Sequence, residues 1–168
     1  MKVGALLALA LGLWFAAALQ QALAYRMVIF GAMPDFILVF LAASSPRLNR
    51  VPAAWNGFAA GVVQGAVAGA NLTHYTISRT ITSFLLARLP DLRLESGIPL
   101  AAATAFFTTL VAQVIFMFLA APRGILSFLG ATMGSALFNG VLVIPVFLVI
   151  ERVLGGHHPK RRQSRKRR

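Results

Sequence analysis

A series of glycines at four-residue spacing is the feature that most constrains this fold. Gly57, Gly61, Gly65 and Gly69 recur in GFAAGVVQGAVAGA, where most of the other residues are alanine or valine. Four residues are close to one helical turn, so these glycines share one helix face. In an apolar segment such a face lets another helix approach closely, because close packing drives helix association in lipid. A flexible glycine-rich loop is the alternative, but a solvated loop would not be this apolar.

The segment that follows predicts a second helix, which turns back on the first. Leu72, Ile77, Ile81 and Leu85 form an apolar stripe at helical spacing, and Arg79 lies on or near the polar side. We expect this helix to be buried against other helices. The link at residues 69–71 is short, so the two helices should form a tight antiparallel hairpin.

The composition indicates an integral membrane protein. The chain of 168 residues is 58% hydrophobic, has a mean hydropathy of +0.78 and is only 12% charged, whereas soluble domains carry about 25% charged residues. We predict an all-α membrane domain over residues 1–154, followed by a basic tail at 155–168. Its six transmembrane helices should form a compact bundle, with spans at about 3–24, 27–45, 53–70, 72–89, 99–121 and 125–150.

The first apolar run could instead be a cleaved secretory signal. Lys2 supplies a positive start, and Ala22, Leu23 and Ala24 fit a cleavage pattern of small residues. The apolar body of the run is longer than the ~7 to 15 residues of a signal core. An uncleaved anchor is therefore the preferred interpretation.

The positions of the basic residues predict the orientation of the six spans. Two basic residues, Arg26 and Arg123, fall on one side, and Arg79 falls within a span. The other side collects Lys2, Arg47, Arg50, Arg88, Arg93, Arg152 and the seven Lys and Arg residues of positions 160–168. The positive-inside rule then places both termini in the cytoplasm. A terminal basic run of this kind favours contact with anionic lipids over binding of nucleic acid.

Polar residues inside the spans predict one buried layer. Asp35 follows Pro34 in the interior of the second span, and Arg79 lies at a matching depth of roughly 10 to 12 Å at 1.5 Å per residue. Gln64 and Gln113 fall at similar depth, so we expect an ion pair between Asp35 and Arg79 with both amides nearby. The alternative is that Arg79 extends toward the outer surface while Asp35 lines a kink at Pro34. A further kink is expected where Pro145 interrupts the sixth span.

No set of residues in the sequence predicts catalysis. The chain has no cysteine, and His157 and His158 adjoin the basic tail without a carboxylate at ligand spacing. His74, at the hairpin turn, is expected to be a capping or solvated residue. Nucleotide-binding and hydrolase motifs are absent from the sequence. We therefore expect a protein that is not an enzyme and has no catalytic, metal or cofactor site.

Three segments carry a resemblance to a known family. They are MPDFILVFLAA, with Pro34 and Asp35; the glycine segment of residues 57–89; and LFNGVLVIPVFLVIERV, with Asn139 and Pro145. The chain resembles the rod shape-determining protein MreD family of bacteria, in length and span order as well. Family members often have an acidic residue immediately after the position that matches Gln64, and this chain has Gly65 there. Any role of that acid therefore does not transfer to this chain.

The resemblance implies a non-enzymatic scaffold subunit of the cell-elongation machinery for peptidoglycan synthesis. It implies a bitopic MreC-like partner and, through that partner, the MreB filament and the synthase pair of RodA and a class B penicillin-binding protein. It also implies a fold similar to the substrate-binding subunits of energy-coupling-factor vitamin transporters.

That fold similarity supplies a rival function, a vitamin-binding transporter subunit. Such a subunit would also have six spans and an alanine-rich first helix, like that around Ala16, Ala17, Ala18 and Ala22. Trp14 and Trp55 are the only tryptophans, and no aromatic cluster accompanies polar groups in the short outer loops. The sequence therefore favours the scaffold. An intramembrane enzyme is a distant third.

Overall fold

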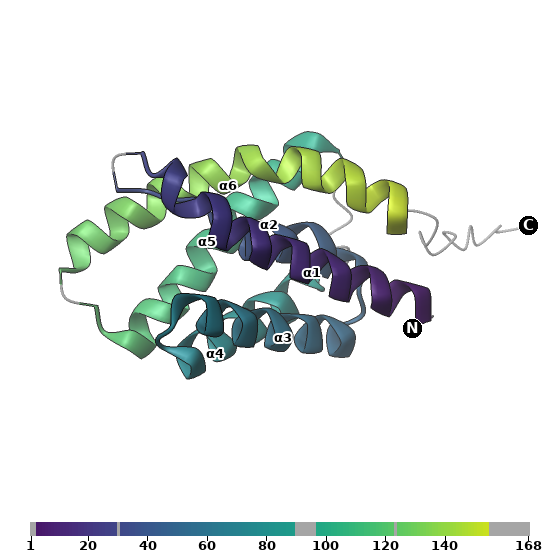
Figure 1. Ribbon diagram of the computed structural model, residues 1–168, viewed down its shortest axis with the longest axis horizontal. Coiled ribbons are helices and arrows are strands. Elements are labelled where there is room, and N and C mark those ends of the chain that lie inside the picture. The colour runs from purple at the N-terminus through teal and green to yellow at the C-terminus, as the bar shows by residue number, and fades with distance from the viewer. Residues whose placement is uncertain (1–2, 30, 90–96, 123, 155–168) are drawn as a thin grey trace, which may run out of the picture.

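The computed structural model describes residues 3–29, 31–89, 97–122 and 124–154, which form an all-α fold (Figure 1). Within these ranges the named helices and 3₁₀ turns follow one another in this order: α1 (Val3–Leu23), η1 (Ala24–Met27), α2 (Phe36–Ser44), η2 (Ser45–Arg47), α3 (Arg50–Ala68), α4 (Leu72–Leu86), α5 (Ile98–Ala120) and α6 (Ile125–Leu154). No β-strand forms within these ranges, although Ile29 and Ala32 make an isolated β-bridge. Three segments are long and apolar enough to cross a membrane: Val3–Met27, Ile98–Ala120 and Ile125–Ile150.

Helices α3 and α4 form the antiparallel hairpin that the glycine spacing predicts. A Cβ at Gly61 would lie 2.7 Å from the carbonyl oxygen of Tyr75 and would also clash with Thr76 Cα; one at Gly65 would lie 2.6 Å from Leu72 Cα. A Cβ at Gly57 would clash with the backbone of Arg79 and Thr80. Only glycine therefore allows the two backbones to approach this closely.

Gly69 has a different role from the one its spacing suggests. No atom lies within 4 Å of a Cβ built there, and the residue has φ +65° as the C-cap of α3. Glycine adopts this left-handed conformation without the strain that a side chain causes. The helix therefore ends one residue before the last glycine of the series, and Gly69 makes the turn instead of packing on a helix.

The second predicted helix is much shorter than expected. The sequence predicts a span over residues 27–45, but residues 28–29 and 31–35 are not helical and α2 begins only at Phe36. Proline has no N–H to donate and disfavours helical geometry in the preceding residue. Pro34 therefore precedes the helix and does not kink it, and Asp35 caps α2 with its side chain.

All nine residues of α2 are buried, which makes it the central element of the fold. It lies against α6, α1, α5, α3 and α4. The other helix ends differ from the expected spans by four residues or fewer: α3 begins at Arg50, α4 ends at Leu86 and α6 extends to Leu154. Helix α6 continues on both sides of Pro145.

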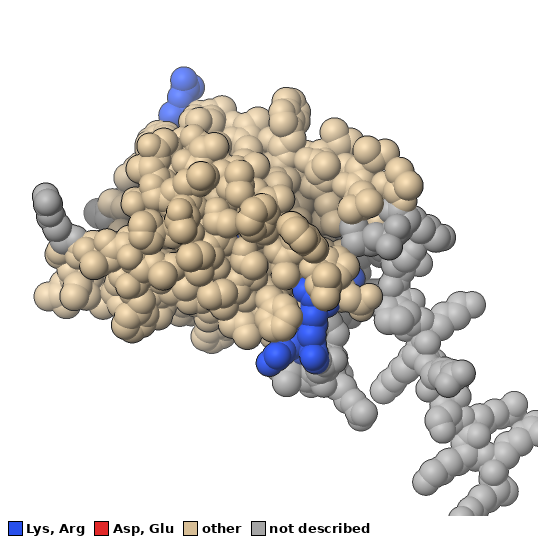
Figure 2. Space-filling view, turned by 90° about the horizontal axis from the view of Figure 1, so that it is seen from below, with Lys and Arg blue, Asp and Glu red and all other residues tan. Residues whose placement is uncertain are grey.

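Around the apolar core of α2, this protein buries many polar side chains and leaves many large apolar side chains exposed. The face of α4 with Ser78, Arg79, Thr82 and Ser83 is buried, while the predicted stripe of Leu72, Ile77, Ile81 and Leu85 is exposed. In the three long apolar segments only 22%, 33% and 22% of the most apolar window is buried. Figure 2 shows one face of the molecule, on which the described basic side chains lie near the margins and the rest is uncharged. The first residues of α1 and the last of α6 lie at the same end (Figure 1).

Candidate functional site

The start of α2 contains a buried ion pair. Arg79 Nη2, from α4, lies 2.8 Å from Asp35 Oδ2, and the side chains of Arg79 and Asp35 are 0% and 10% exposed. The predicted contact between these two residues is therefore present. Because the guanidinium is fully buried, the alternative in which Arg79 extends to the surface does not apply.

Both partners of the pair make further contacts. The second carboxylate oxygen of Asp35 accepts a hydrogen bond from the backbone N–H of Leu38 at 2.9 Å, so the same side chain caps α2. Arg79 Nη1 donates to Ser78 Oγ at 3.3 Å, and the guanidinium carbon lies 5.1 Å from the centre of the Tyr75 ring. Ser78 in turn donates to the carbonyl oxygen of Ala112 in α5 at 2.5 Å.

Two amides from other helices bind the same short stretch of backbone. Gln20 of α1 accepts from the N–H of Phe36 at 2.8 Å and donates to the carbonyl oxygen of Pro34 at 3.4 Å. Asn139 of α6 accepts from the N–H of Asp35 at 2.9 Å. The freed N–H groups at the start of a helix need such acceptors when they are buried.

Asn139 also extends the network to α5. Its amide nitrogen donates to Thr109 Oγ1 at 2.9 Å, and Thr109 donates to the carbonyl oxygen of Ala105. Asn139 and Thr109 are both 0% exposed. Side chains from α1, α4, α5 and α6 therefore meet at the first residues of α2. We call this set the α2-start cluster: Gln20, Asp35, Arg79, Thr109 and Asn139.

The two glutamines of the predicted layer do not join this cluster. Gln64 is buried in α3, but its Oε1 has no hydrogen-bond partner among the described residues. Gln113 is partly exposed, and no hydrogen bond joins it to Asp35 or Arg79 in the described part of the chain. Depth along a helix does not determine which way a side chain points around it. Thr109, one turn before Gln113, occupies the place in the cluster instead.

Sequence reasoning also missed a second group of polar contacts at the other end of α2. Ser45 Oγ lies 2.7 Å from Ser83 Oγ, and Ser83 donates to the carbonyl oxygen of Ala53 at 2.6 Å. Asn56 donates to Ser44 Oγ at 3.0 Å. We call these four side chains, of Ser44, Ser45, Asn56 and Ser83, the α2-end cluster. The available signal was their polarity within apolar segments, but serine and asparagine also occur at helix ends and turns.

The ion pair and hydrogen bonds of these two clusters fix the position of α2 relative to the neighbouring helices. In the α2-start cluster, the carboxylate and guanidinium neutralise each other, and the amides pair with backbone groups. The structure shows no group of three or more potential metal ligands among the described residues. His74 is neither capping nor fully solvated: its Nδ1 is buried without a partner among the described residues, and its ring packs on Phe116.

Several residues of the predicted topology lie outside the described ranges. They are Lys2, Arg93, Arg123 and the basic tail at 155–168, together with the acids Asp91 and Glu95. Among the described basic residues, Arg50 begins α3 and Arg88 follows α4, which places both at one end of the hairpin.

The chain was compared with known proteins at three levels. No protein-family model, no curated protein and no solved structure matches it.

Proposed function

We propose that this chain is a multi-pass protein of the bacterial cytoplasmic membrane and a non-enzymatic scaffold subunit of the cell-elongation machinery. Three helices are long and apolar enough to cross a membrane. Helices α3 and α4 expose apolar stripes and bury their polar faces. This distribution suits a hydrocarbon surround, where an unpaired polar group is costly and an apolar surface is not.

One observation carries the scaffold proposal: the three segments that resemble the MreD family meet at one point. Asp35, from the first segment, pairs with Arg79, from the glycine segment. The backbone N–H of Asp35 also donates to Asn139, from the third segment. The meeting of these segments indicates that the family-like residues serve one shared structural purpose.

The form of the α2-start cluster favours a scaffold over a small-molecule site. The polar side chains there bind one another and the backbone of residues 34–36, so they hold neighbouring helices in fixed positions. Such an interior stabilises a rigid body, which can present its outer surface to partners. The proposed partner is a bitopic MreC-like protein, which would connect the chain indirectly to RodA and a class B penicillin-binding protein.

The orientation proposed for this body has both termini in the cytoplasm. The first residues of α1 and the last residues of α6 lie at the same end of the molecule, an arrangement that supports an even number of spans (Figure 1). The basic tail would then contact anionic lipids of the inner leaflet.

The rival function, a vitamin-binding transporter subunit, would require a ligand-binding pocket. A specific ligand site combines an apolar pocket with a few convergent polar groups. Two hollows in the described part of the chain are lined mostly by apolar side chains. The polar groups of the α2-start cluster bind one another and the backbone instead.

The test is co-purification of the full chain with the MreC-like protein of the same bacterium, combined with depletion of the chain in that cell. We expect a stable complex and conversion of rods to rounded cells on depletion. Co-purification with an energy-coupling ATPase pair, together with loss of vitamin uptake on depletion, would overturn the proposal. The neighbouring genes offer a quick check, because a coiled-coil MreC-like reading frame and an ATPase pair indicate different classes.

A further inference from the structure

A groove lies on the surface between α4 and α5, with a volume of about 380 Å³. Its lining is apolar apart from threonines, and includes Thr82, Leu85, Ala103, Phe107, Thr108 and Val111. We call it the α4–α5 groove. Phe107 and Val111 are exposed, at 61% and 39%, so the groove is open to the surroundings of the protein.

One lining residue has an unused hydrogen-bonding group. Thr82 Oγ1 is buried and has no partner among the described residues. The other hydroxyls of α4 for which a bond is seen all donate to a carbonyl oxygen: Thr76 to Leu72, Ser78 to Ala112, Thr80 to Thr76 and Ser83 to Ala53. A buried hydroxyl without a partner is unfavourable, and more so away from water. Among the described residues, Thr82 is therefore the buried threonine or serine of α4 whose hydroxyl lacks a partner, and it lines the groove.

The groove is long enough for part of a helix. Along α5 its lining runs from Leu100 to Val111, which corresponds to about 16 Å at 1.5 Å per residue. That length is about half of the ~30 Å hydrocarbon thickness. In the proposed orientation the groove lies in the cytoplasmic half of the membrane, because α4 ends and α5 begins on that side.

We propose that the α4–α5 groove binds a transmembrane helix of the bitopic partner, and that this helix pairs a polar group with the hydroxyl of Thr82. The inference rests on the proposed function and adds the face that the partner occupies. Threonine in a helix has two accessible χ1 rotamers, so the hydroxyl can turn toward an occupant of the groove. Asn, Gln, Ser or Thr on the partner helix can supply the paired group.

A lipid acyl chain is the competing occupant, and Thr82 distinguishes the two. An acyl chain fills apolar space but offers no hydrogen-bond donor or acceptor, so Thr82 would stay unpaired beneath it. A protein helix fills the same space and also satisfies the hydroxyl. The unpaired group therefore favours the helix.

The first experiment removes the hydroxyl. Thr82→Val keeps the shape of the side chain, and we expect recovery of the complex with the full-length MreC-like partner to fall about threefold or more. Thr80→Val is the matched control, because the hydroxyl of Thr80 already donates to Thr76 on the same helix; recovery should stay at the wild-type level. Wild-type recovery with Thr82→Val would overturn the proposal.

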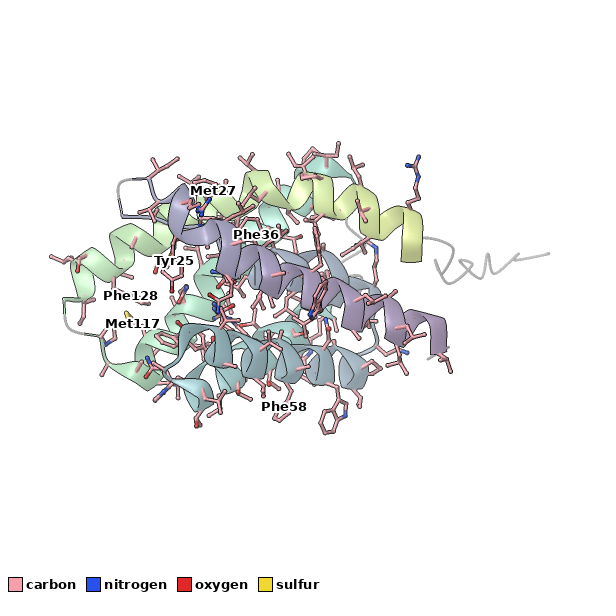
Figure 3. The ribbon with its side chains drawn as sticks, in the orientation of Figure 1. Tyr25, Met27, Phe36, Phe58, Met117 and Phe128 are labelled. Atoms are coloured by element: carbon pink, nitrogen blue, oxygen red, sulfur yellow. The ribbon has the colours of Figure 1, made fainter. Side chains whose placement is uncertain are left out.

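The second experiment maps the occupied face with single thiols. The chain contains no cysteine, so Phe107→Cys places one thiol in the groove and Phe58→Cys places one on α3. Phe58 is also exposed, at 45%, and points away from the bundle (Figure 3). The two positions lie about 13 Å and about 12 Å from the starts of α5 and α3. They are therefore matched in residue type and depth.

With single cysteines along the partner helix, we expect disulfides to Phe107→Cys at helical spacing and none to Phe58→Cys. A normal complex without cross-links to Phe107→Cys would assign the groove to lipid and overturn this inference, while the scaffold function would stand. Cross-linking from Phe58→Cys alone would place the partner helix on α3. That result would also overturn this inference and leave the scaffold function standing. If the wild-type chain fails to bind the partner, both the function and this inference fail.

Discussion

At the scale of single residues, the stability of the interior depends on the ion pair between Asp35 and Arg79. Removing one partner of a buried ion pair leaves an uncompensated charge, which costs about 3 to 5 kcal/mol. Asp35 has a second task, because its other oxygen caps α2 through Leu38. The two residues are therefore unequal, and the loss of Asp35 removes more than the ion pair.

A charge swap tests this inequality. We expect Asp35→Arg and Arg79→Asp each to abolish stable folding, measured as thermal unfolding in lipid nanodiscs. The double variant should recover only part of the stability, because arginine cannot accept the hydrogen bond of Leu38. A double variant no more stable than either single one would show that the two residues act independently.

Asn139 offers a second test at this scale. Asn139→Leu leaves the buried N–H of Asp35 without an acceptor, so we expect a loss of about 1 to 3 kcal/mol in the free energy of unfolding. The matched control is Gln113→Leu, since Gln113 makes no hydrogen bond to the cluster within the described ranges. Comparable losses in both variants, in the same unfolding assay, would contradict a special role for Asn139.

The ion pair of the α2-start cluster could be predicted from the sequence because both partners are charged. The contacts of the neutral amide side chains could not be predicted in the same way. A carboxylate and a guanidinium at equal depth in apolar spans have few partners other than each other. Gln20, Gln64, Gln113 and Asn139 can each pair with a backbone group or with another amide, and their rotation about the helix axis is not encoded in depth. Gln20 and Asn139 therefore joined the cluster without being predicted there, whereas Gln64 and Gln113 make no hydrogen bond to the pair among the described residues.

At the scale of elements, the glycine hairpin was predictable and α2 was not. The four-residue spacing directly encodes a flat helix face, and the contacts of Gly57, Gly61 and Gly65 follow from it. In sequence, residues 27–33 are as apolar as a transmembrane helix, and hydropathy alone does not distinguish an apolar non-helical segment from a helix. The decisive signal was Pro34 followed by Asp35, a pair that is typical of a helix start as well as of a kink.

Substitution of Gly61 tests the close approach of α3 and α4. Even Gly61→Ala should lower stability, because its Cβ would meet the backbone of Tyr75 and Thr76, and Gly61→Leu should prevent folding. Gly130→Ala in α6 is the control, since no atom lies within 4 Å of a Cβ there. Alanine favours a helix over glycine by about 1 kcal/mol, so the control should be neutral or stabilising. Equal behaviour of the two alanine variants in thermal unfolding would contradict the packing.

At the scale of the whole molecule, the alternation of helix direction was predictable. Each apolar run is separated from the next by a short polar or glycine-containing link, and short links make successive helices run in opposite directions. The burial pattern of α4 was harder to predict, since an apolar stripe on a helix indicates the buried face in water and the exposed face in lipid. Ile77, Ile81 and Leu85 are exposed, which agrees with the second case if the proposed membrane location holds.

Fusion to a reporter that is active only outside the cytoplasm tests the orientation. We expect a fusion after Arg168 to be inactive and a fusion at Ala70, in the turn between α3 and α4, to be active, because the turn and the termini lie at opposite ends. Activity after Arg168 and none at Ala70 would invert the proposed orientation. Activity at both positions would contradict the number of spans between them.

The central position of α2 also has a consequence for the order of biosynthesis. A helix of nine residues is too short to cross the ~30 Å of hydrocarbon by itself. Asp35 and Asn139 are 104 residues apart, and at about 5 to 20 residues per second the ribosome needs roughly 5 to 20 s to synthesise that stretch. During this interval the chain lacks the helix whose Asn139 later accepts the N–H of Asp35, the N-cap residue of α2. The buried position of the start of α2 is therefore complete only after α6 has been synthesised and Asn139 has bound the N–H of Asp35.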